Sequence, residues 1–285
     1  MRWSSGNNPD LEDRRGSSGG GGMRLGGRGL GVGGVLVLVV LSVIFKQDFL
    51  GMLGGGGAGD PTAPVQGPVE SSAGEEQLKG FVGAVLDSVQ TTWDAELPRQ
   101  TGKSYEHARL VLFRDAIESA CGFAEAATGP FYCPGDNKVY VDLGFFQELQ
   151  DRFGAPGDFA QAYVLAHEIG HHVQFLVGTE SRVHRAMQER PDQANALSVA
   201  MELQADCYAG VWGHTAAAHG ILETGDVEEG LGAAAAVGDD RIQRMSTGRV
   251  NPEGFTHGSA AQRSGWFRRG LSGGKLAECD TFEQR

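Results

Sequence analysis

Residues 158–178 read DFAQAYVLAHEIGHHVQFLVG, and this stretch decides the fold around it. Asp158 is a favoured residue at the start of a helix, and Gly178 is a favoured residue just after a helix ends. Apolar residues cover nearly the whole circumference between them, which predicts a buried helix. His167 and His171 are four positions apart and lie on the same face. Because burying two imidazoles without partners is costly, the stretch also predicts a metal ion between them.

The segment from His167 to His171 has the pattern His-Glu-x-x-His, in which two histidines bind one zinc ion and the glutamate acts on a water molecule there. Glu168 is rotated by about 100° from His167 along a helix and can reach that water. We predict one Zn²⁺ per chain, with Glu168 as the general base. His172 points about 100° away from His171 and is predicted to pack behind the ligands.

A catalytic zinc site needs a third protein ligand, and the sequence places a candidate downstream. A third histidine in an extended form of this motif is excluded, because that form requires a glycine and a histidine at positions 174 and 177. This chain has Gln174 and Val177 there. Glu202 lies in a second apolar stretch, from about residue 195 to 217, and is predicted to be the third ligand. Asp206 lies one turn later and is predicted to orient a ligand histidine. The alternative, an exposed acidic helix face, is opposed by the apolar neighbours of both carboxylates.

These motifs resemble those of the bacterial family of putative neutral zinc metallopeptidases, whose site is related to that of the gluzincins, with glutamate as the third ligand. The resemblance covers nearly all of the chain except the glycine-rich region. It is carried by MRW at residues 1–3, EDRRG at 12–16, GPFYCP at 129–134, the run 152–174, ELQADCYAG at 202–210, GDDR at 238–241 and THGSAAQR at 256–263. It implies zinc, a peptidase-type active site and a membrane or envelope setting, but no particular substrate.

The remaining sequence predicts an α+β domain in which helices dominate, a zincin-like metallopeptidase domain with a small β-sheet. Helices are predicted over residues 75–96, 183–189, 195–217, 227–245 and 259–269, and strands over 108–113 and 138–143. A short edge strand is predicted between these strands, at residues 129–133.

Three further residues are candidates for contact with a peptide or protein substrate. Phe131 and Tyr132 are predicted to lie on the edge strand and to pair with an extended peptide beside the metal. The alternative is that both rings fill the core. His257 is predicted to open the last helix and to donate a hydrogen bond to the developing oxyanion. Its alternative role is that of an ordinary polar residue at a helix N-terminus.

An uncharged run of sixteen residues, 30–45, lies between Arg28 and Lys46. It is consistent with a signal anchor, a cleaved signal peptide or a buried helix, and the absence of a clear cleavage site after it favours an uncleaved anchor. Five arginines precede the run, which predicts a single-pass protein of the cell membrane with its N-terminus in the cytoplasm and its catalytic domain outside. The predicted divisions are a basic, glycine-rich tail (1–28), a transmembrane helix (29–46), a Gly/Pro-rich linker (47–74) and the catalytic domain (75–285).

The four cysteines fit an oxidising compartment. They form no C-x-x-C pair, which argues against a thiolate metal site, and their even number predicts two disulfides. Of the three pairings, we favour Cys121 with Cys133, which closes a short loop, and Cys207 with Cys279, which ties the C-terminal segment to the helix that carries Glu202.

Composition narrows the class of function. The net charge of −12 argues against nucleic acid as a partner. The sequence predicts a membrane-anchored zinc endopeptidase, and it identifies no envelope protein partner. One alternative is a zinc-binding scaffold that has lost turnover, against which Glu168 argues. The other is a metallohydrolase that acts on a non-peptide bond.

Overall fold

The computed structural model describes residues 1–6, 8–16, 71–125 and 128–282. These residues belong to one compact unit in which helices dominate and the sheets are small, as the sequence predicted. Within the described ranges, no helix combines the length and the apolar character needed to cross a membrane. The predicted transmembrane helix (29–46) and all but the last four residues of the predicted linker (47–74) lie outside the described residues.

The helices follow one another along most of the chain and account for most of the packing. They are α2 (Ala73–Thr101), α3 (Gly144–Asp151), α4 (Asp158–Val177), α5 (Thr179–Glu189), α6 (Ala194–Ala218), α7 (Asp226–Ala236), α8 (Asp239–Thr247) and α9 (Ala260–Gly273). Short 3-10 turns lie at η3 (Pro191–Gln193), η4 (Pro252–Gly254) and η5 (Leu276–Cys279).

The prediction of a single helix over 227–245 is wrong, because the helix is interrupted between α7 and α8. The break lies at Val237 and Gly238. A Cβ atom at Gly238 would lie 2.3 Å from the backbone nitrogen of Ala260. The chain therefore turns where α9 approaches it closely. A local sequence pattern cannot predict this contact.

The main sheet contains a mixture of parallel and antiparallel pairs. Its order is β1 (Leu11–Asp13), β2 (Arg109–Phe113), β6 (Lys138–Asp142) and β5 (Phe131–Cys133). The first three strands are parallel, and β5 runs antiparallel to β6 at the edge of the sheet, which confirms the predicted edge strand. A separate hairpin joins β3 (Ala116–Ser119) to β4 (Gly122–Glu125) and was not predicted.

The N-terminal segment belongs to the same unit as the helices. Strand β1 pairs with β2, and the indole of Trp3 packs edge-on against Phe81 of α2 at 5.3 Å. Arg15 is buried between Asp13 and Glu76, to which its Nη2 atom lies 2.7 Å away in both cases. In the structure, the described residues 1–6 and 8–16 thus belong to the domain, with Leu11–Asp13 in its sheet, and are not a separate tail, in contrast to the predicted division at residue 28.

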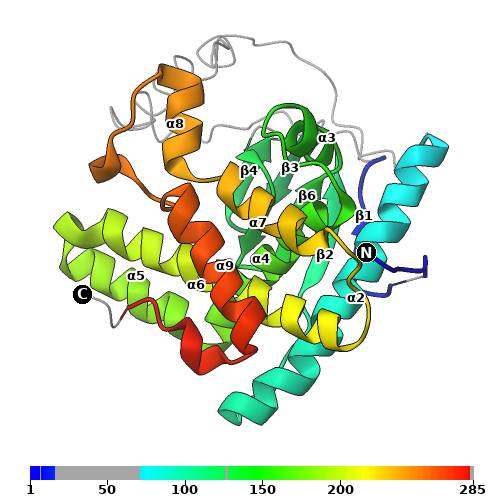
Figure 1. The fold of residues 1–285 in the computed structure, drawn as a ribbon, viewed down its shortest axis with the longest axis horizontal. Coiled ribbons are helices and arrows are strands. Elements are labelled where there is room, and N and C mark those ends of the chain that lie inside the picture. Colours follow the sequence, from blue (N-terminus) through cyan, green and yellow to red (C-terminus); the bar gives the residue numbers. More distant parts are fainter. Residues whose placement is uncertain (7, 17–70, 126–127, 283–285) are drawn as a thin grey trace, which may run out of the picture. The chain divides into compact units, whose positions relative to one another are not determined.

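The predicted motif helix, α4, lies at the centre of this unit (Figure 1). It packs against α2, α6, α7 and the edge strand β5. Its crossing with α6 is close, because a Cβ atom at Gly170 would lie only 2.9 Å from the carbonyl oxygen of Ala205. This close crossing brings the histidines of α4 next to the carboxylates of α6.

Candidate metal centre

The three predicted ligands come together between α4 and α6. His167 Nε2 lies 3.2 Å from Glu202 Oε2, and His171 Nε2 lies 3.5 Å from Glu202 Oε1. One ligand atom from each residue lies within 4.8 Å of the others. Donor atoms around a tetrahedral zinc ion are separated by about 3.3 Å, given the usual bond lengths. The two nitrogens and the carboxylate therefore fit a zinc ion.

A buried charged cluster stands behind His167. Asp206 Oδ1 lies 2.8 Å from His167 Nδ1, and Asp206 also accepts from Arg263 Nε at 2.8 Å and Nη2 at 2.9 Å. The hydroxyl of Tyr163 donates to the same carboxylate. We call Asp206, Arg263 and Tyr163 the charged cluster. The structure thus places Asp206 in the orienting position expected from the sequence, while Arg263 and Tyr163 were not anticipated.

The charges of this cluster shift the pKa of each member. Burial alone would raise the pKa of Asp206, but Arg263 and His167 lower it below its ordinary value. Burial opposes the charged form of His167, yet Asp206 raises the pKa of this histidine to about 10. In contrast, burial lowers the pKa of His171, whose Nδ1 faces the neutral amide of Gln174 at 2.9 Å. This shift favours the neutral form of His171, which is the form that binds a metal.

Glu168 is buried beside the ligands. Burial raises the pKa of its carboxyl group to about 7, with the positive charge of His167 and a hydrogen bond from the backbone of Tyr132 acting against the rise. The negative charge of Glu202 raises the pKa of Glu168 further. A carboxyl group that exchanges its proton near neutrality suits general acid–base chemistry.

A cavity of about 700 Å³ opens over the ligands. Its walls include Phe131, Tyr132, Glu168, Glu202, His257 and Arg263. Phe131 stacks on Tyr140 at 4.9 Å, while the Tyr132 hydroxyl lies 2.9 Å from His172 Nδ1. Both aromatic residues therefore pack partly into the domain and partly line the cavity, while their pairing with a peptide stays a prediction.

His257 reaches the cavity from the loop before α9. Helix α9 begins with a capping box between Ser259 and Gln262, so His257 lies two residues ahead of its N-cap. Its Nδ1 atom lies 3.3 Å from Asp239 Oδ1, and its side chain is 52% exposed. The hydrogen bond to Asp239 raises the pKa of His257 and so favours its protonated form. In its protonated form, His257 would be a hydrogen-bond donor at the cavity wall.

The two histidines of the His-Glu-x-x-His motif and the carboxylate of Glu202 thus form a group that could hold a metal ion. The chain belongs to the family described as "putative neutral zinc metallopeptidase", whose family model matches residues 1–282. It is 46% identical over 291 residues to "Uncharacterized protein YpfJ" of Escherichia coli strain K12, with 99% of each chain covered. It is 45% identical over 212 residues to "Uncharacterized protein Rv2575" of Mycobacterium tuberculosis strain H37Rv, covering 70% of this chain and 69% of the relative. No solved structure is significantly similar to the chain.

The predicted disulfides are both present. Cys121 is bonded to Cys133 at the end of β5, and Cys207 of α6 is bonded to Cys279 of η5. The first bridge fixes the edge strand to the hairpin turn between β3 and β4 beside the cavity. The second fixes the C-terminal segment to the helix that carries Glu202.

Proposed function

We propose that the protein is a membrane-anchored, zinc-dependent endopeptidase. The observation that carries this proposal is the meeting of His167, His171 and Glu202 in one cavity with the buried carboxyl group of Glu168. A sheet edge, β5, lies beside this group of residues, as peptide recognition by strand addition requires. That edge favours an extended peptide over a small non-peptide ester or amide.

Each residue has a distinct part in the proposed reaction. The zinc ion, when bound, lowers the pKa of water and polarises the scissile carbonyl. Glu168 takes the proton from the attacking water and delivers it to the nitrogen of the leaving amine. His257 donates a hydrogen bond to the oxygen on which negative charge develops. The backbone of Phe131 and Tyr132 holds the peptide in extended form along β5.

The location of the protein is a separate proposal. The two disulfides support an oxidising compartment, so we infer that the catalytic domain lies outside the cytoplasm. The apolar run 30–45, outside the described residues, would attach it to the membrane. Because β1 pairs with β2, residues 11–13 lie on the same side of the membrane as the domain, which does not fit the predicted single crossing with a cytoplasmic N-terminus, so we propose only attachment to the membrane. Alkaline phosphatase fused after residue 285 should be active, and an inactive fusion would contradict this location.

The enzymatic proposal is tested with the full chain, by zinc content and by cleavage of a peptide library. Wild type is expected to bind one zinc ion and to cleave. Glu168→Gln should keep the zinc but lose turnover by at least about a hundredfold, because proton transfer is lost. Glu202→Ala should lose the zinc. Zinc binding without cleavage would favour the scaffold, and a wild type without zinc would exclude both functions.

A further inference from the structure

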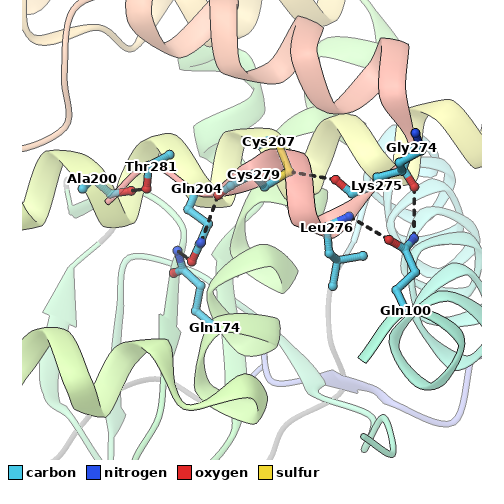
Figure 2. Close-up of a disulfide and its surroundings, with 10 residues drawn as sticks. All are labelled: Gln100, Gln174, Ala200, Gln204, Cys207, Gly274, Lys275, Leu276, Cys279 and Thr281. Carbon is cyan, nitrogen blue, oxygen red and sulfur yellow. Dashed lines mark hydrogen bonds between the residues drawn. A yellow bond between two sulfur atoms is a disulfide. The ribbon is translucent and has the colours of Figure 1, made fainter. Parts of the chain in front are cut away.

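A chain of amide hydrogen bonds runs from His171 to the C-terminal disulfide. His171 Nδ1 lies 2.9 Å from Gln174 Oε1 on the same helix. Gln174 Nε2 lies 2.7 Å from the carbonyl oxygen of Met201 and 3.2 Å from Gln204 Oε1. Gln204 Nε2 in turn lies 3.0 Å from the carbonyl oxygen of Cys279 (Figure 2). We call Gln174 and Gln204 the amide relay.

Two backbone carbonyls set the direction of every hydrogen bond in the relay. A carbonyl oxygen only accepts, so Gln174 Nε2 must donate to Met201 and Gln204 Nε2 must donate to Cys279. This orientation turns Gln174 Oε1, an acceptor, toward His171. His171 must therefore carry its proton on Nδ1, which leaves Nε2 with a free electron pair on the side of Glu202. The relay selects the tautomer that a ligand histidine needs.

The relay also restrains a second ligand. Met201 immediately precedes Glu202, so the hydrogen bond from Gln174 holds the backbone beside this carboxylate. Gln174 is fully buried and Gln204 is 6% exposed, so water does not compete freely for either amide. One buried amide thus fixes the ring of one ligand and the main chain next to another.

We propose that Gln174 and Gln204 are positioning residues for the metal, and that the C-terminal segment anchored by Cys207–Cys279 is their fixed end. The inference rests on the proposed zinc site and adds that zinc affinity depends on a contact outside the ligands. The hydrogen bonds of the Gln204 side chain lead to Gln174 and to Cys279, so it acts on His171 through Gln174.

A third glutamine supplies a matched control. Gln100, at the end of α2, donates to the carbonyl oxygen of Gly274 at 3.0 Å and accepts from the backbone nitrogen of Leu276 at 2.8 Å. Figure 2 shows it near Gly274 and Leu276, farther along the same C-terminal segment from Gln174 and Gln204, which lie near Cys279. It therefore holds this segment as Gln204 does, but no hydrogen bond leads from it to a ligand.

The experiment measures zinc affinity by competition with a chromophoric chelator, and thermal unfolding of the metal-free full chain. The variants are Gln174→Leu, Gln204→Leu, the double variant and Gln100→Leu. Gln174→Leu should weaken zinc binding on the order of tenfold, as loss of an orienting partner does. Gln204→Leu should weaken it about threefold, the size of an indirect effect. Gln100→Leu should lower the melting temperature comparably but change zinc affinity by less than about twofold, because it lacks a path to His171.

The double variant separates positioning from general destabilisation. If Gln204 acts through Gln174, the double variant should bind zinc as weakly as Gln174→Leu alone. Additive losses, or an equal loss in Gln100→Leu, would overturn the proposal. Unchanged affinity in Gln174→Leu would overturn it as well, while the zinc site itself stood. Absence of zinc from wild type would instead refute the proposed function.

Discussion

The two histidines that we propose as zinc ligands have different supports, although they lie one helical turn apart. His167 rests on the charged cluster, where Asp206 is completely buried and pairs with Arg263. His171 rests on the amide relay, which carries no net charge. The charged cluster holds its histidine firmly but makes the fold depend on a buried ion pair. The relay orients its histidine through neutral dipoles at a smaller cost to folding. A single substitution should therefore separate metal binding from folding at His171 but not at His167.

The largest expected effect is that of Asp206→Ala. It leaves the guanidinium of Arg263 buried without its main partner, so the free energy of unfolding of the metal-free protein should fall by about 3–5 kcal/mol. Zinc affinity should fall by more than about tenfold, because His167 loses its orienting acceptor. Chemical denaturation and chelator competition measure the two effects.

A double variant sharpens this prediction. Asp206→Leu with Arg263→Met removes both charges, so it should recover most of the stability while zinc binding stays weak. If Asp206→Ala unfolded at the same denaturant concentration as wild type, the charged cluster would not support the fold.

The two disulfides should differ in their effect on the metal. Replacing Cys207 and Cys279 by alanine loosens the fixed end of the relay, and zinc affinity should fall about threefold. Replacing Cys121 and Cys133 should leave zinc affinity within about twofold but raise the KM for peptides, because β5 is freed. Either change should cost about 2–5 kcal/mol of stability. Equal losses of zinc affinity on replacing the two disulfides would contradict this prediction.

The two supports should also differ in their response to pH. The raised pKa of His167, about 10, means that its protonated form stabilises the metal-free fold fully below pH 6.5. This contribution is lost as pH rises from 6.5 to about 10. Denaturation of the metal-free protein across that range should show the loss in wild type and in Gln174→Leu. Asp206→Asn should flatten the dependence, and an unchanged slope in that variant would argue against the ion pair.

The smallest expected effect is that of Thr281→Val. Thr281 Oγ1 donates to the carbonyl oxygen of Ala200 at 2.6 Å, which attaches the C-terminal segment to α6 in addition to the Cys207–Cys279 disulfide (Figure 2). Loss of this hydrogen bond should cost about 1 kcal/mol in stability. Zinc affinity should stay within about twofold, and a larger change would mean that any loosening of the segment disturbs the metal.

The sequence predicted the parts of the site that follow helical spacing. The ligand pair on α4 and the pair Glu202 and Asp206 on α6 are each separated by one turn, and the structure brings them together. The relay has no such signature. In the sequence, Gln174 only showed that the extended motif with a third histidine is absent. Its hydrogen-bond partners Met201 and Gln204 lie on α6, so helical spacing within α4 cannot predict them.

Other differences from the sequence predictions also come from tertiary contacts. Residues 1–16 precede a glycine-rich stretch that contains Arg24 and Arg28, and the sequence therefore assigned them to the tail, yet Leu11–Asp13 form a strand that pairs with β2. A strand of three residues is too short for an alternating pattern to reveal. The sequence also did not predict the strands Ala116–Ser119 and Gly122–Glu125, because four residues are similarly few for an alternating pattern.

The central claim is that one zinc ion binds between α4 and α6. Anomalous diffraction at the zinc edge, on crystals of the full chain, tests this claim most directly. The account predicts one strong peak, coordinated by Nε2 of His167, Nε2 of His171 and the carboxylate of Glu202. A peak at the acidic group of Asp158, Asp226 and Glu229 instead, or no peak at the two histidines, would contradict it.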